Sequence, residues 1–264
     1  MTREPPSVPK TAVIALTEAP ERLARARRAA SRLGATLMQD TAAVAADWQL
    51  VYDDFGLTLI GGGPEGLRVD IRPPHRSRPE DRITRRQPLG RALGRPVRTV
   101  VDATAGFGDD ALRLAGFGLE VTAVERSPIA ALCLEERVAQ LAAGDDPELA
   151  AAAGRLTVVE GEGIEVLAGL TAAPDVVYLD PMFPPKRKRS ARPRKAMQVL
   201  GALVGPDADV DSLLAAAIAA SGRRVVLKRP DDAPPLGRPA ASYGGTTVRY
   251  DMYTGRSARG SDDV

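Results

Sequence analysis

The sequence contains little of the side-chain chemistry on which many enzymes rely. Its 264 residues include one cysteine, one histidine and one tryptophan, and only 4% are aromatic. A single cysteine excludes a disulfide within the chain, and one histidine with one cysteine cannot build a His/Cys zinc site. We therefore expect no metal, and we expect the chemistry to come from carboxylates, hydroxyls, the backbone, an aromatic ring or a cofactor.

Long hydrophobic runs are also absent. No segment reaches the roughly 18–20 apolar residues that span a membrane. Residues 1–6 lack the apolar segment that follows a basic one in a secretory signal. We therefore expect a cytoplasmic protein without a membrane partner.

The formal net charge is only +2, but the charges are segregated along the chain. Residues 68–98 contain ten arginines and three acidic residues, residues 102–180 contain fifteen acidic and four basic residues, and residues 186–195 contain seven basic residues and no acidic one. An acidic segment suits a cationic ligand, and basic segments suit a polyanion such as a nucleic acid. The near-neutral total therefore excludes neither kind of partner.

The N-terminal part of the chain has a mixed pattern. A short apolar run at 12–16 indicates a strand, residues 18–33 have the periodicity of a helix, and three short strands follow up to residue 71. We expect residues 1–72 to form a small α+β domain. The Arg- and Pro-rich residues 73–96 are expected to form a basic connecting arm.

From residue 97 the pattern changes to strands that alternate with helices. Repeated β-α-β units predict an α/β domain with a mostly parallel, Rossmann-like sheet covered by helices on both faces. We place this domain at residues 97–255, with a final antiparallel edge strand at 246–253 and a flexible tail at 256–264. Ligands of such a sheet bind beyond the carboxyl ends of its strands.

A glycine turn follows the first strand of this domain. The strand ends at Asp102, and Gly106 and Gly108 allow a tight turn and the close approach of a ligand to the backbone. The turn alone does not separate NAD from S-adenosylmethionine. Asp109 and Asp110 come next and would repel a pyrophosphate, so they favour S-adenosylmethionine, whose ammonium and sulfonium groups are positive.

Acidic residues also follow the next two strands. Glu125 ends the second strand, where it can accept hydrogen bonds from ribose hydroxyls, and Glu162 with Gly163 follows the third. The glycine turn after the first strand and the turn after the third contain no basic residue that would bind a phosphate, which again suits a cationic nucleoside. The alternative is an α/β domain without a ligand, in which the acids stabilise helix N-termini.

The fourth strand ends in an acid, a proline and an aromatic residue: Asp180, Pro181 and Phe183. This segment resembles the Asp/Asn-Pro-Pro-aromatic motif of methyltransferases that act on exocyclic amines. The lone pair of such an amine is delocalised into the base, so a carboxylate and a carbonyl that accept both N–H bonds can turn it toward the methyl group. Phe183 can stack on the base, and the three residues are the predicted catalytic group.

Basic residues surround this predicted reaction end. Lys186, Arg187, Lys188 and Arg189 come directly after it, and Lys228 and Arg229 follow the fifth strand. We expect these six side chains to bind the phosphates of a nucleic acid, with an affinity that depends strongly on salt.

Four segments together resemble one family, the RsmJ family. They are residues 102–110, 124–126, 177–184 (with Asp-Pro-Met-Phe-Pro) and 226–236 (with Lys-Arg-Pro-Asp), and the resemblance covers roughly residues 50–255. The resemblance implies a class I methyltransferase fold that uses S-adenosylmethionine to methylate the N2 of a guanine in small-subunit (16S) ribosomal RNA. It implies cofactor contacts at Asp109, Asp110, Glu125, Arg126, Glu162, Gly163 and Asp180.

The sequence departs from the family pattern at three places. Asp109 stands where the family has an arginine, Glu162-Gly163 replaces a pair of small residues, and residues 84–90 replace the Gly-rich stretch that usually precedes the first strand. Two other functions stay open on the sequence alone. One is the methylation of adenine or cytosine amines in DNA, because the motif indicates an exocyclic amine as the acceptor but does not specify the base. The other is a methyltransferase-like protein that only binds RNA.

Overall fold

The computed structural model describes residues 10–40, 46–62, 66–71, 84, 86–182, 195–205, 209–245 and 247–256. The chain divides into two compact units, the first with residues 1–73 and 189–203 and the second with residues 74–188 and 204–264. The N-terminal unit thus includes residues 189–203, which the sequence analysis assigned to one continuous methyltransferase domain. Val199 and Leu200 in that segment are buried.

The N-terminal unit is a five-stranded sheet with a long helix. It contains β1 (Thr11–Ala15), α1 (Pro20–Leu33), β2 (Thr36–Met38), β3 (Trp48–Asp53), β4 (Gly56–Gly61), β5 (Leu67–Asp70) and most of α7 (Lys195–Val204). The strand order is β2-β1-β3-β4-β5, with β1 parallel to β2 and β3, and β4 antiparallel to β3 and β5. Pro20 opens α1 and Gly34 ends it in the left-handed conformation.

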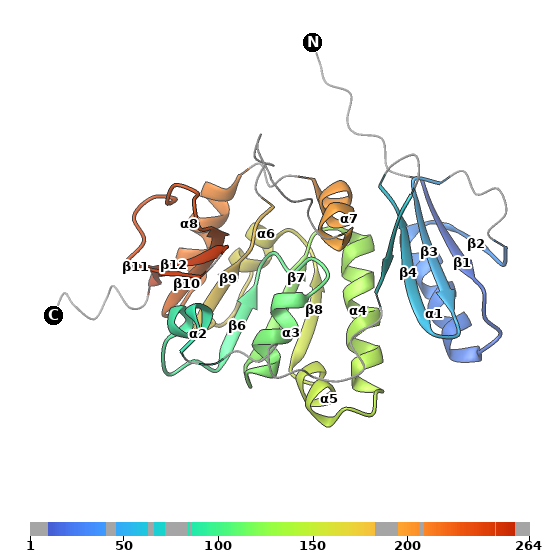
Figure 1. The fold of residues 1–264 in the computed structure, drawn as a ribbon, viewed down its shortest axis with the longest axis horizontal. Helices are drawn as coiled ribbons and strands as arrows, with labels where there is room; N and C mark the ends of the chain where they lie inside the picture. Colours follow the sequence, from blue (N-terminus) through green and yellow to red (C-terminus); the bar gives the residue numbers. More distant parts are fainter. Residues whose placement is uncertain are drawn as a thin grey trace, which may run out of the picture. The chain divides into compact units, whose positions relative to one another are not determined.

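The second unit contains a seven-stranded sheet in the order β11-β12-β10-β9-β6-β7-β8 (Figure 1). Its strands are β6 (Thr99–Asp102), β7 (Glu120–Glu125), β8 (Leu156–Glu160), β9 (Val176–Leu179), β10 (Arg224–Pro230), β11 (Ala241–Gly244) and β12 (Val248–Thr254). Its helices are α2 (Pro88–Leu93), α3 (Asp109–Gly116), α4 (Pro128–Ala142), α5 (Pro147–Ala153), α6 (Gly163–Ala168) and α8 (Val210–Ala220). The strand β12 is antiparallel to both of its neighbours, β10 and β11, whereas the other described strand pairs of this sheet are parallel.

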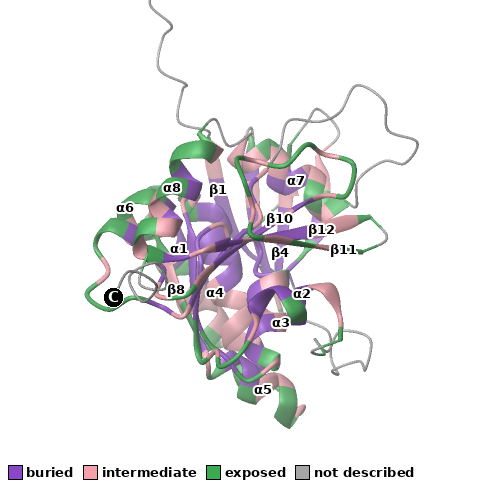
Figure 2. Ribbon diagram, turned by 90° about the vertical axis from the view of Figure 1, so that its left-hand side faces the viewer, coloured by how far each residue is buried: buried purple, intermediate pink, exposed green. Residues whose placement is uncertain are grey.

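The apolar side chains of the strands alternate between two cores. Val176 and Tyr178 of β9 join the cluster under α2 and α3, whereas Val177 and Leu179 join the cluster under α6 and α8. Figure 2 shows the strands buried in the middle of the fold and the outer faces of the helices exposed. Both faces of the sheet are thus covered, as a continuous apolar strand requires.

The second unit differs from the sequence expectation in two places. Residues 88–93 of the predicted connecting arm form the helix α2, whose Leu89, Ala92 and Leu93 are buried in the core of this unit. One and a half turns are too short for a periodic signal in the sequence. The predicted edge strand is antiparallel but lies inside the sheet, because β11 pairs with its outer side.

Candidate functional site

The order of the strands defines a topological switch point at the carboxyl end of the sheet. The chain passes from β6 outward to β7 and β8, and then returns to the other side of β6 to form β9 and β10. The loops after β6 and β9 therefore separate in opposite directions. This is the switch point at which open α/β sheets bind their ligands.

The side chain of Glu125 fixes the glycine turn that follows β6. This buried carboxylate accepts hydrogen bonds from the backbone N–H of Gly106 (2.8 Å) and from that of Ser127 (2.7 Å). Gly106 and Gly108 have φ of 55° and 82°, and a Cβ on Gly108 would lie 2.2 Å from Leu134 Cδ1. The predicted glycines are thus required by the conformation and the packing of the turn.

Asp102 ends β6 and is buried beneath the turn, where its Oδ1 accepts a hydrogen bond from Thr104 N (3.1 Å). Burial raises the pKa of Asp102 well above its usual range, although the bond from Thr104 opposes this effect. A buried carboxylate at the end of a central strand gains most from a cationic ligand, because a positive charge offsets its lost hydration.

Replacing Asp102 by Asn is expected to make the protein more stable than the wild type, and the difference between the two should be larger at higher pH. In the native fold the raised pKa favours the protonated acid, so the wild-type protein loses stability above about pH 4, where an unfolded aspartate ionises, at up to about 1.4 kcal/mol per pH unit. Asn does not titrate. Urea unfolding should show a larger advantage of Asp102→Asn at pH 8 than at pH 4, and a difference independent of pH would contradict this prediction. Asp145→Asn, on an exposed turn, is the matched control.

The two acids at the start of α3 point in different directions. Asp109 is 75% exposed and accepts a hydrogen bond from Arg137, whose guanidinium also binds the carbonyl of Phe107. Asp110 is only 12% exposed and binds the hydroxyl of Tyr178 (2.7 Å) and the ammonium of Lys228 (2.6 Å). The structure therefore brings Asp110 into the site and turns Asp109 away toward α4.

Asp180 directly follows β9 and is fixed through its backbone and its side chain. Its N–H donates to Thr104 Oγ1 (2.6 Å), and its Oδ2 lies 2.8 Å from Lys228 Nζ. The side chain is 33% exposed, so it is accessible at the carboxyl end of the sheet. Pro181 is buried behind it. Phe183, the third predicted catalytic residue, lies outside the described residues.

The remaining predicted cofactor residues have structural contacts. Gly163 begins α6 so close to β6 that a Cβ would lie 2.7 Å from the carbonyl oxygen of Ala103. Glu162 is exposed at the N-cap of the same helix. Arg126 donates to the carbonyl of Val204 (2.9 Å).

The predicted phosphate ligands need correction where the structure describes them. Lys228 lies between Asp110 and Asp180, so its charge is already balanced by two carboxylates. Arg229, on β10, is only 7% exposed. Neither side chain is presented to a phosphate on the surface. Residues 186–189, the basic run, lie outside the described residues.

Three further residues of the site did not emerge from the sequence analysis. Thr104 positions Asp180, Tyr178 holds Asp110, and Arg137 holds the glycine turn. A tyrosine in the middle of an otherwise apolar strand was the available signal, since a buried hydroxyl needs a hydrogen-bond partner. Nothing in the local sequence connects Thr104 with Asp180 or Arg137 with Phe107.

The described residues contain no group of three or more His, Cys, Asp or Glu side chains that could hold a metal ion. None of the helices described is both long and apolar enough to span a membrane. The carboxyl end of the sheet instead offers carboxylates, backbone and a glycine turn. This donor set fits S-adenosylmethionine, which has hydroxyls, an ammonium and a sulfonium but no phosphate.

The strand order, the braced glycine turn and the Asp-Pro sequence after β9 define a class I methyltransferase with a Rossmann-like sheet. Residues 41–255 match the family model described as "Putative SAM-dependent methyltransferase". The structure of a SAM-dependent methyltransferase from Neisseria gonorrhoeae superposes with a TM-score of 0.68 at 26% identity, over 93% of this chain and 96% of that one.

Curated relatives show which family of methyltransferases the chain belongs to. Ribosomal RNA small subunit methyltransferase J of Pseudomonas aeruginosa is 39% identical over 245 residues, which cover 86% of this chain and 89% of the relative. The protein of the same name from Aeromonas hydrophila is 48% identical over 157 residues, 58% of this chain and 62% of that relative. The chain belongs to the ribosomal RNA small subunit methyltransferase J family, which confirms the resemblance seen in the sequence, and its cofactor is S-adenosylmethionine.

Proposed function

We propose that this protein transfers a methyl group from S-adenosylmethionine to the exocyclic N2 of a guanine in small-subunit ribosomal RNA. The observation that carries the proposal is the position of Asp180 in a chain of this family: it ends the strand next to β6, is partly exposed, and is fixed by Thr104 and Lys228. The names of the relatives support the ribosomal RNA substrate.

The acceptor amine is the difficult partner in this reaction. Asp180 accepts an N–H bond of the amine, and a backbone carbonyl of the adjoining loop accepts the other, so the nitrogen lone pair turns out of the plane of the base. The nitrogen forms a bond to the methyl carbon, and one of its protons passes through the Asp180 carboxylate to solvent, which leaves the methylated amine neutral. The carboxylate stabilises the positive charge on the nitrogen while that bond forms.

Other residues hold the reactants in place. When bound, S-adenosylmethionine supplies the methyl group, and its sulfur takes the electron pair of the broken bond. Glu125 would hold the ribose, Asp102 would add negative charge near the cationic end of the cofactor, and the turn at Gly106 and Gly108 would let the cofactor approach the backbone. The contribution of this end of the sheet is alignment of the amine, the methyl carbon and the sulfur.

The RNA is bound by the basic run that follows the catalytic loop in the sequence. Lys186, Arg187, Lys188 and Arg189 hold phosphates next to the target nucleotide, which leaves its stack to reach the carboxyl end of the sheet. The protein acts in the cytoplasm, where the ribosomal RNA or the ribosomal subunit is its partner.

The direct test is transfer of labelled methyl groups. The protein is incubated with labelled S-adenosylmethionine and small-subunit RNA from a strain that lacks the enzyme, and the labelled nucleoside is identified. Label in N2-methylguanosine supports the proposal, and RNA without label in guanine contradicts it. Transfer to adenine or cytosine of DNA would favour the DNA enzyme instead. RNA binding without cofactor binding in calorimetry would favour a non-catalytic protein.

A further inference from the structure

Lys228 lies at the carboxyl end of β10, beside the end of β9. The two strands are parallel with Leu227 paired to Leu179, so Lys228 and Asp180 are the next residues along each strand. The Lys228 ammonium lies 2.8 Å from Asp180 Oδ2 and 2.6 Å from Asp110 Oδ2. One positive charge therefore joins the proposed catalytic carboxylate to a second carboxylate from α3.

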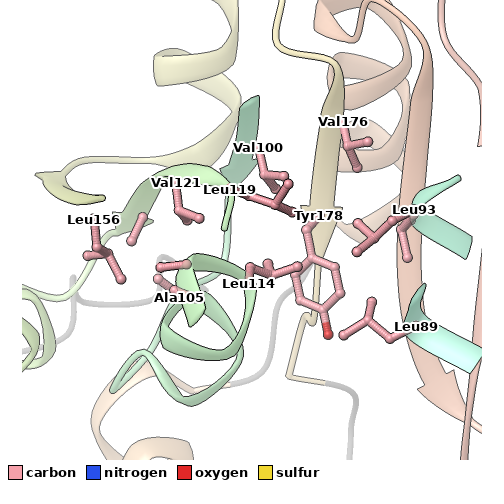
Figure 3. Packing of buried hydrophobic residues seen from close by; sticks show 14 of the residues in the cluster. Leu89, Leu93, Val100, Ala105, Leu114, Leu119, Val121, Leu156, Val176 and Tyr178 are labelled. Carbon is pink, nitrogen blue, oxygen red and sulfur yellow. The ribbon is translucent and has the colours of Figure 1, made fainter. Parts of the chain in front are cut away.

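The Asp110 end of this bridge is anchored in the core. Asp110 also accepts hydrogen bonds from the Tyr178 hydroxyl (2.7 Å) and from Arg113 (3.3 Å). Figure 3 shows the Tyr178 ring between Leu114 of α3 and the leucines of α2. Burial raises the pKa of Tyr178. The hydroxyl therefore stays protonated and donates a hydrogen bond to Asp110. Lys228 is thus held by a carboxylate that is itself hydrogen-bonded to β9 through Tyr178.

The Asp180 end is more open. Its side chain is 33% exposed, compared with 12% for Asp110, and it stands where the strand gives way to a loop. We infer that Lys228 is a positioning residue for methyl transfer, which holds the Asp180 carboxylate in the orientation that accepts the N–H bond of the acceptor amine. The inference rests on the proposed function, because it assigns Lys228 a role in the same reaction.

The charge of Lys228 is consistent with this role. Burial opposes the charged form, but the two carboxylates outweigh burial and raise the pKa of Lys228 above its ordinary value. The ammonium is therefore present throughout the physiological pH range. A phosphate that approached it would also approach Asp110 and Asp180, and the repulsion between like charges makes this a poor phosphate site.

Replacement of Lys228 by Met tests the inference, because Met keeps the length of the side chain but removes the ammonium. We expect kcat for methyl transfer to fall about 100-fold, the loss typical of a misplaced catalytic group, with KM for RNA and the cofactor affinity near wild type. Lys228→Arg keeps a cation and should recover a large part of kcat. Tyr178→Phe removes only the outer hydrogen bond and should lower kcat less, again without raising KM.

Lys195→Met is the matched control, because it removes the same charge from an exposed position next to the basic run. If Lys195 binds RNA, its variant loses about 0.7–0.9 from the salt slope of RNA affinity and keeps kcat at saturating RNA. The same result for Lys228→Met would show that Lys228 is a phosphate ligand and would overturn the inference, as would an unchanged kcat.

If Lys228→Met does not fold, the Lys228→Arg and Tyr178→Phe variants test the inference. An unchanged kcat in Tyr178→Phe together with no activity in Lys228→Arg would contradict positioning through Asp110. A wild-type protein that transfers no methyl group would instead contradict the proposed function.

Discussion

Asp180→Ala is expected to abolish methyl transfer, with kcat reduced by about 10²–10³-fold or more, the loss found when one group that stabilises developing charge is removed. The reason is the geometry at the end of β9, where a partly exposed carboxylate is fixed by Thr104 and Lys228. The affinity for S-adenosylmethionine should fall less, because Glu125 and the glycine turn stay in place. Single-turnover rates and calorimetry with the cofactor measure the two effects separately.

Two variants make the result specific. Asp180→Asn keeps the shape of the side chain and one acceptor oxygen, as the Asp/Asn alternative of the motif allows, so it should lose less activity than Asp180→Ala. Asp109→Asn changes a nearby acid that is 75% exposed and bound to Arg137, so it should keep most of its activity. Near-normal turnover of Asp180→Ala would refute the assigned role, and an equal loss in Asp109→Asn would show that the effect is not specific to Asp180.

The difference between Asp109 and Asp110 also shows where sequence reasoning ends. The sequence places both acids at the start of the helix after the glycine turn, and the structure confirms the helix. Successive residues on a helix point about 100° apart, so an error of one residue in the helix phase exchanges the inward and the outward acid. The sequence does not determine a helix start to one residue, and it could not assign the contact.

The fold was more accessible to prediction than the contacts. The alternation of strands and helices predicted the parallel sheet, and the ends of its strands predicted Asp102, Glu125 and Asp180 at one edge, because residue type and strand direction suffice for that. Lys228 and Asp110 are 118 residues apart in the chain. Their pairing depends on β10 lying next to β9 and on α3 covering that face. A basic residue beside a predicted RNA site was therefore assigned to phosphate.

The second large effect is expected for Glu125→Gln. The buried Glu125 carboxylate accepts one hydrogen bond from Gly106 N and one from Ser127 N, so it fixes both the glycine turn and the start of α4. A glutamine can accept only one of these bonds, and its NH₂ group would face the other N–H. Leaving one buried amide unpaired should lower the free energy of unfolding by about 1–3 kcal/mol.

The affinity for the cofactor should fall as well. If the carboxylate also accepts the ribose hydroxyls, the same substitution removes an acceptor from the ligand, and about 1.4 kcal/mol corresponds to each tenfold loss of affinity. We expect a loss of about 10–100-fold in calorimetry at a temperature where the variant is folded. Glu160→Gln is the control, because Glu160 pairs with Glu125 in register one strand further out and is exposed. Reduced stability with unchanged cofactor affinity would make Glu125 a brace of the turn alone, and the ribose would then have to be held by other groups at the ends of β7 and β8.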